Sequence, residues 1–292
     1  MKSTISLLST ALVLAAPPAL HAQGGRGGSQ AAAMREASQL DIAGRTTEAR
    51  MIFQRLIDSA ADPAAKAAAQ RAMAMSYAFD GNCGRTLEYE QLVIDYGKTR
   101  EAAEPQNAFY QEGEMANEGA RVCIDAGDLA SADKWYRLGA ELGNREPEPR
   151  THPRSLWDFR LAHALGRLAA RRGDAAEARR QIALARRALD GDSAMAAQQE
   201  RFFPYLTGYV ALYAGDAHDA ERDLARAVSL RGNERDPFMV ALLGMAYERL
   251  GRADDAHATY RKAYDLATAH NPPAAFVRPF VRKKLGVAPN GY

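Results

Sequence analysis

Few residues of this chain have the types and spacing that catalysis requires. The histidines are scattered, and no His-Glu-x-x-His or Cys-x-x-Cys motif occurs. No serine lies in a Gly-x-Ser-x-Gly elbow. His218 and His257 each have an aspartate nearby, but two ligands without a third seldom hold a metal ion. The sequence therefore predicts no enzyme activity, no metal and no cofactor.

Six glycines recur in one local context and mark turns between amphipathic stretches. A glycine allows the sharp turn after a helix, and an alanine five residues later, present in five of the six, lets the returning helix pack closely. By subtraction, the glycines are 37, 46, 46, 42 and 36 residues apart, close to the period of helix-turn-helix repeats. The chain is thus expected to be a stack of helical hairpins. The glycines are Gly44, Gly81, Gly127, Gly173, Gly215 and Gly251.

The last unit carries the most specific pattern. Residues 240–247 read Val-Ala-Leu-Leu-Gly-Met-Ala-Tyr, and Ala256, Tyr260 and Ala263 follow Gly251. This spacing resembles the tetratricopeptide repeat, Leu-Gly-x-x-Tyr followed by Ala-x-x-x-Phe/Tyr-x-x-Ala. The units around Gly173 and Gly215 are good matches, and the earlier units are more degenerate. The resemblance covers roughly residues 30 to 270, and its specificity comes from repetition.

The unit at Gly81 is the weakest match. Thr86 stands where alanine is expected, and Glu90 stands where an aromatic residue is expected. The second helix of this unit is therefore a candidate for a shifted register. The long steps between units imply loops or longer helices, notably around residues 96–107 and 144–155.

Composition favours an all-α fold. The chain is rich in alanine, leucine, arginine and glutamate and lacks the alternation of strands. The resemblance implies an α-solenoid, a right-handed superhelix of about six hairpins in which each unit packs on its neighbours. We expect the repeat array at residues 31–270, then a capping helix and tail at 271–292 whose basic residues form a polar outer face.

The N-terminus has the features of a signal peptide at residues 1–22. Lys2 precedes an apolar run too short to span a bilayer, two prolines break it, and Ala22 is a small residue at the cleavage point. We expect cleavage after Ala22, a periplasmic or secreted chain without a membrane span, and a flexible glycine-rich tether at 23–30. An uncleaved anchor is the alternative.

The chain contains two cysteines, Cys83 and Cys123. In an exported chain, a matched pair commonly forms a disulfide. By the repeat alignment, Cys83 begins a second helix and Cys123 lies near the end of the next first helix, on the same edge of the stack. We predict a disulfide, worth about 4 kcal/mol in the chain-entropy model. Two buried thiols that fill apolar space are the alternative.

The charge balance is nearly neutral. Thirty-eight basic and thirty-six acidic residues give a net charge of +2, or +1 without Lys2. Nucleic-acid binders usually show a strong basic excess or stripe, so we expect no nucleic-acid partner. The arginine-rich run at 167–187 is interrupted by acidic residues and is typical of a solvated helix face.

The resemblance implies a concave face lined mainly by the first helix of each unit, where an extended peptide or partner helix often binds. Tyrosines four residues apart stack along one helix face, and neighbouring arginines add hydrogen bonds and carboxylate pairing. The tyrosines could instead pack between units. The predicted partner-binding residues are Arg121, Arg160, His163, Arg167, Tyr205, Tyr209 and Tyr213.

These observations predict a non-enzymatic scaffold of the cell envelope. It would bind another protein or a peptide, with acidic or carboxylate groups, in an open, pre-formed groove. An envelope enzyme with a repeat body, or a glycan or lipid carrier with an enclosed cavity, are the alternatives.

Overall fold

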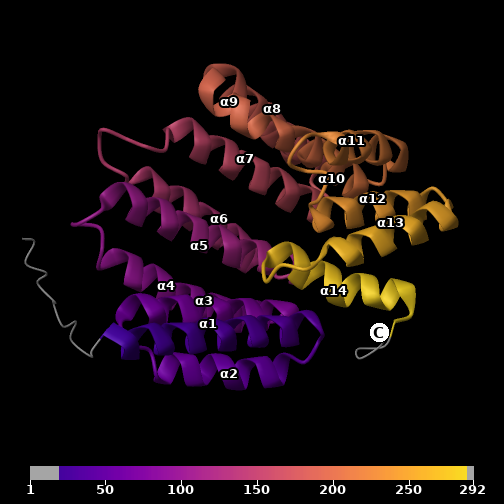
Figure 1. Ribbon diagram of the computed structural model, residues 1–292. Coiled ribbons are helices and arrows are strands. Elements are labelled where there is room, and N and C mark those ends of the chain that lie inside the picture. The colour runs from indigo at the N-terminus through magenta and orange to yellow at the C-terminus, as the bar shows by residue number, and fades with distance from the viewer. Residues whose placement is uncertain (1–19, 288–292) are drawn as a thin grey trace, which may run out of the picture.

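The structure is a computed structural model that describes residues 20–287. Within this range every regular element is a helix (Figure 1). The helices are α1 (Leu20–Ile42), α2 (Thr46–Asp58), α3 (Pro63–Phe79), α4 (Cys83–Lys98), α5 (Pro105–Ala126), α6 (Leu129–Asn144), α7 (Arg154–Arg171), α8 (Ala175–Gly191), α9 (Ser193–Gln199), the 3-10 helix η1 (Glu200–Phe202), α10 (Phe203–Ala214), α11 (Ala217–Ser229), α12 (Pro237–Arg249), α13 (Ala253–Leu266) and α14 (Pro272–Leu285).

Consecutive helices pair into six hairpins within the described residues. The pairs are α1/α2, α3/α4, α5/α6, α7/α8, α10/α11 and α12/α13, and each hairpin packs on the next. The short helices α9 and η1 form an insertion between the fourth and fifth hairpins, and α14 follows the sixth. The all-α, solenoid-like architecture predicted from the sequence is confirmed, as are the long connections after α4 and α6.

The six repeat glycines form the hairpin turns. All have positive φ, between 67° at Gly81 and 91° at Gly215, a conformation that residues with a Cβ rarely adopt. In four turns the residue after the glycine accepts, through its side chain, the backbone N–H three residues further on, so only two or three residues separate one helix from the next. These N-cap residues are Asn82, Asp128, Asp174 and Asp216.

The weak second unit keeps the common register. Thr86 is fully buried, as alanine is at the equivalent place in the other units. Its hydroxyl donates to the carbonyl oxygen of Asn82 at 2.9 Å. The register shift considered for α4 is therefore absent, because the extra polar atom of Thr86 is satisfied inside its own helix.

The helix α14 closes the array on itself. It packs on α12 and α13, and also on α3 and α5 near the other end of the chain (Figure 1). Just before it, Nε2 of His270 lies 2.7 Å from Oδ2 of Asp41 in α1. The His270 ring lies 5.5 Å from the ring of Phe53 and 5.4 Å from that of Phe79, between ring centroids. The two ends of the array are thus joined.

Closure buries the face that the sequence predicts as an open groove. Met75, Val122, Tyr209 and Phe238 come from four different first helices and belong to one apolar core. The expectation of an open groove along the whole concave face is therefore wrong, because first helices from opposite ends of the array pack together.

The predicted polar outer face of α14 also needs correction. Arg278 is buried, its Nε donates to the carbonyl oxygen of Ala267 at 2.7 Å, and its guanidinium lies 4.2 Å from the Tyr264 ring centroid. Because α14 lies between both ends of the array, it cannot leave all of its basic residues in solvent.

At the N-terminus, α1 spans residues 23–30, for which the sequence predicts a flexible tether. Helix propagation needs only one further hydrogen bond per residue, so the helix extends backward from the alanines at 31–33 through the glycines. The predicted signal peptide lies outside the described residues up to residue 19, and the predicted cleavage site after Ala22 falls inside α1. None of the described helices combines the length and hydropathy that crossing a membrane requires.

Candidate functional site

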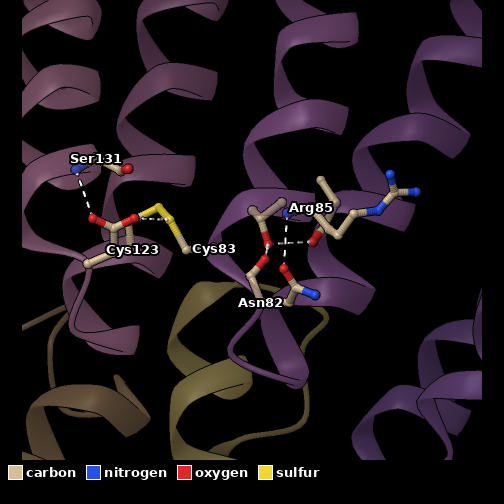
Figure 2. Close-up of a disulfide and its surroundings, with 8 residues drawn as sticks. Asn82, Cys83, Arg85, Cys123 and Ser131 are labelled. Atoms are coloured by element: carbon tan, nitrogen blue, oxygen red, sulfur yellow. Dashed lines mark hydrogen bonds between the residues drawn. A yellow bond between two sulfur atoms is a disulfide. The ribbon is translucent and has the colours of Figure 1, made fainter.

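A disulfide joins the second and third hairpins (Figure 2). Cys83 begins α4, directly after the N-cap Asn82, and Cys123 lies in the last turn of α5. Their sulfur atoms are 2.01 Å apart and their Cα atoms 4.8 Å apart. The neighbouring Asp128 caps α6 by accepting the N–H of Ser131 at 3.0 Å. The predicted disulfide is confirmed, and it fixes α4 to α5 beside two helix starts.

A pocket of about 250 Å³ opens beside α5, α7 and the insertion that precedes α10. Four of the seven residues predicted from the sequence to bind a partner line it. They are Arg121 from α5 and Arg160, His163 and Arg167 from α7. The structure therefore brings the predicted cationic residues together at one place.

Arg167 lies at the bottom of this cationic cluster and is 6% exposed. Its guanidinium donates to the hydroxyl of Tyr205 at 3.0 Å and to that of Tyr136 at 3.2 Å. Among the described residues no carboxylate forms an ion pair with Arg167. A buried guanidinium held only by neutral groups keeps much of its desolvation cost, so an anion that reaches it is strongly favoured.

Arg121 is the second arginine of the pocket without an ion pair in the described part of the chain. Its Nε is buried and has no hydrogen-bond partner there. Its guanidinium lies 4.6 Å from the ring centroid of Phe238 in α12. Arg160, in contrast, is paired with Glu114. The pocket therefore carries two guanidinium charges that no lining carboxylate neutralises.

Asp125, one turn after Arg121, is the nearby acidic group. Burial raises its pKa to about 6, while Arg121 and Arg167 act in the opposite direction. A carboxylate with this pKa is ionised at neutral pH, but it leaves a net positive charge on the cluster of Arg121, Arg167 and Arg171. The excess charge favours an anionic ligand.

His163 supports the pocket as a neutral side chain. Burial, and secondly the charge of Arg167, lower the pKa of His163 well below its usual value. One ring nitrogen lies 3.3 Å from the carbonyl oxygen of Phe202, and the ring packs against Tyr205 with centroids 5.0 Å apart. A neutral imidazole that donates to Phe202 fixes the insertion against α7.

The tyrosines predicted to contact a partner position the arginines instead. Tyr205 is 5% exposed and Tyr209 is fully buried, so the structure shows packing between units for both. Tyr209 accepts from Arg171 at 3.4 Å, and Tyr213 packs on Tyr209 with ring centroids 4.6 Å apart. Burial raises the pKa of Tyr205 to about 12, so its hydroxyl stays protonated beside Arg167.

Six of the ten residues that line the pocket were not among the predicted site residues: Glu114, Asn117, Tyr136, Phe159, Gln199 and Phe202. Gln199 and Phe202 belong to the insertion, and Tyr136 lies on α6, the second helix of its hairpin. The 42-residue step between Gly173 and Gly215 signals extra chain in this unit, but not that it folds back over α7. The ring of Tyr136 is buried in the core, and its hydroxyl accepts from Arg167 at the pocket.

The chemistry available to this site is anion binding. Two guanidinium groups without an ion pair and the side-chain amide of Gln199 provide donors for a carboxylate, whereas the single N–H of the neutral His163 is already donated to Phe202. Among residues 20–287, no three histidine, cysteine or acidic side chains are grouped so that they could hold a metal ion. His218 and His257 are both exposed on second helices.

Comparison with known proteins identifies one segment directly. Residues 239–270, which cover most of α12 and all of α13, match the tetratricopeptide repeat family. No curated protein shows significant similarity to the chain. The matched hairpin has the same turn glycine as the five hairpins before it and the same buried alanine as four of them, the second hairpin having Thr86 instead. Residues 239–270 therefore form a tetratricopeptide repeat.

Proposed function

We propose that this protein is a non-enzymatic scaffold of the cell envelope that binds a carboxylate of a partner protein in the pocket beside α5 and α7. Tetratricopeptide repeats suggest protein partners. The observation that carries the finer proposal is the pair Arg121 and Arg167, which line one pocket without an ion pair in the described residues.

The dimensions of the pocket limit what enters it. A volume of about 250 Å³ holds a side chain or a chain terminus, not a folded segment. An Asp or Glu side chain, or a C-terminal carboxylate, supplies two acceptor oxygens to the guanidinium groups. The rest of the partner would lie on the surface around the pocket, because the remaining concave face is occupied by the core.

Pre-organisation supports tight binding at this pocket. The hydroxyls of Tyr136 and Tyr205 already hold Arg167. Since Arg167 does not have to be ordered when the ligand arrives, little binding free energy is lost to side-chain entropy. The desolvation of its charge is likewise complete before binding.

The envelope location is the part of the proposal that rests on sequence. The N-terminal pattern of residues 1–22 is that of an exported chain. The Cys83–Cys123 disulfide supports export, because disulfides persist mainly in oxidising compartments.

Expression with a C-terminal tag, cell fractionation and N-terminal sequencing test the envelope location. We expect a mature chain that starts at Gln23 and is found outside the cytoplasm. A cytoplasmic chain retaining Met1 would contradict export.

Selection from a random peptide library with free C-termini tests the binding proposal. We expect the selected peptides to share an acidic residue or to require the free carboxylate, and to bind Arg121→Gln at least tenfold more weakly. Arg222→Gln provides the matched control, since Arg222 is exposed on α11 and pairs with Asp219. Selected peptides without a common anionic group, or equal binding to both variants, would refute the proposal.

A further inference from the structure

A second pocket, of about 280 Å³, lies between α3 and α5 at the end of α4. One wall consists of small and apolar side chains, among them Ala64, Ala67 and Met115. The polar groups on the α5 side are Asn107, Gln111 and Glu112, of which Glu112 alone is a carboxylate. This pocket shares no lining residue with the arginine pocket, although α5 contributes to both.

Glu112 is a buried carboxylate without a partner. It is 1% exposed, and neither carboxylate oxygen has a hydrogen-bond partner among the described residues. The chain makes room for it at Gly97, where an added Cβ would lie 2.7 Å from Cγ and 3.1 Å from Oε1 of Glu112. A buried acceptor left unsatisfied is costly, so its persistence in a pocket wall points to a ligand.

The arginines that line this pocket form ion pairs with carboxylates other than Glu112. Arg71 forms an ion pair with Glu118, with an N–O distance of 2.7 Å, and Arg100 pairs with Glu104. Their charges are thus balanced by other carboxylates. Glu112 remains as the one lining carboxylate, among the described residues, that could complement a cation inside the pocket.

The titration of Glu112 fits a site for a positive charge. Burial, and secondly the neighbouring carboxylate of Glu101, raise the pKa of Glu112 to about 7. Arg145 and Lys98 act in the opposite direction but do not reach its oxygens. A bound cation would stabilise the ionised carboxylate, so cation binding and proton release are coupled at neutral pH.

We propose that this pocket binds an alkylammonium group, such as a lysine side chain or a primary amine on a short apolar chain. The ammonium would bind to the carboxylate of Glu112, and the methylene groups would lie along the alanine and methionine wall. A divalent metal ion fits less well, because Glu112 supplies a single carboxylate and metals require several ligand oxygens. This site stands independently of the arginine pocket.

A titration with butylammonium, followed by NMR of the full chain with its disulfide intact, tests the proposal. We expect saturable shifts of the Gly97 and Glu112 amide signals, at least tenfold weaker binding to Glu112→Gln, and weaker binding to Gly97→Ala. Because protonation of Glu112 competes with the cation, affinity should fall about tenfold between pH 8 and pH 6.

Matched controls separate charge from packing. Glu88→Gln changes an exposed carboxylate on α4, in the hairpin before that of Glu112. Glu88 is paired with Arg85, and this variant should bind butylammonium as the parent does. Butan-1-ol has the same apolar chain without the charge and should give no saturable shift at Gly97. Equal binding of butan-1-ol, equal binding to Glu112→Gln, or no saturable shift at all would overturn the proposal.

Discussion

At the residue scale, the chain buries charged side chains in two different ways. Arg167 is held by tyrosine hydroxyls, whereas Glu112 has no partner among the described residues. The sequence predicted that Arg121 and Arg167 belong to one site, because both fall on first helices of neighbouring units. It left open whether Tyr205 and Tyr209 contact a partner or pack between units, since their burial depends on contacts with other helices.

The raised pKa of Glu112 predicts a pH-dependent cost to folding. Because its pKa is about 7 in the folded state, against an ordinary value of 4.5 in the unfolded chain, the folded chain binds this proton more tightly. The contribution of Glu112 to the free energy of unfolding is fully present below pH 4.5 and is lost as the pH rises through 7. Glu112→Gln should therefore be more stable than the parent at pH 8, by on the order of 2 kcal/mol, and nearly equal at pH 5.

Urea unfolding of both proteins at pH 5 and pH 8 measures this difference. Gln111→Glu is not a suitable control, because it would add a charge to the same pocket; Glu88→Gln serves better and should show no pH-dependent gain. If the stability difference between Glu112→Gln and the parent were the same at both pH values, the pKa of Glu112 would not be raised in the folded chain.

At the element scale, the hairpins were predictable because their signals are local. Turn glycines, the following N-cap residues and the small alanines all act within a few residues of each other. Thr86 shows the limit of this pattern, since a mismatch with the consensus did not shift α4. The insertion formed by α9 and η1 was not predicted, because its position beside α7 depends on a contact between residues far apart in the sequence, His163 and Phe202.

The contact between α6 and α7 depends on glycines that accommodate one indole ring. Trp157 is fully buried, and a Cβ at Gly143 would collide with its ring. We expect Gly143→Ala to lower the free energy of unfolding by roughly 1–3 kcal/mol, as overpacking of a core does. Gly84→Ala in α4 is the control, because its Cβ would meet only Asn82 at 3.9 Å. Thermal unfolding measures the stability of both variants. If Gly143→Ala were as stable as the parent, the Trp157 ring would not pack closely against Gly143.

The disulfide should stabilise the folded chain by closing a loop that restricts the unfolded chain. Replacing both Cys83 and Cys123 by serine is expected to cost about 2–4 kcal/mol, since the 40-residue separation constrains the unfolded chain. Chemical denaturation with and without reductant gives the value. Reductant should destabilise the parent to the level of the double variant and leave that variant unaffected. A parent that is indifferent to reductant would show that the bridge does not form in solution.

At the scale of the whole molecule, the defining feature is closure by α14. The hydrogen bond between His270 and Asp41 joins residues 229 positions apart. No local pattern reports such a contact, because it depends on the accumulated curvature of six hairpins. The sequence therefore predicted a capping helix after the array but not that this helix would also pack on the second and third hairpins.

Removal of residues 271–292 should open the array. The deletion exposes apolar side chains such as Phe79, Phe238 and Val122, which share a core with α14. We expect a larger radius of gyration in small-angle scattering and faster amide exchange in α3, with helical content otherwise retained. If scattering showed the same compact particle and α3 stayed protected, α14 would not hold the two ends together.

The most direct test of the carboxylate site is a double-mutant cycle between the protein and a selected peptide. The acidic group of the peptide is replaced by its neutral amide, and Arg121 is replaced by glutamine, with affinities measured by calorimetry. We predict that amidation weakens binding to the parent at least tenfold and has little further effect on Arg121→Gln. If amidation weakened binding equally in both proteins, the carboxylate would bind elsewhere and the assignment of the pocket would be wrong.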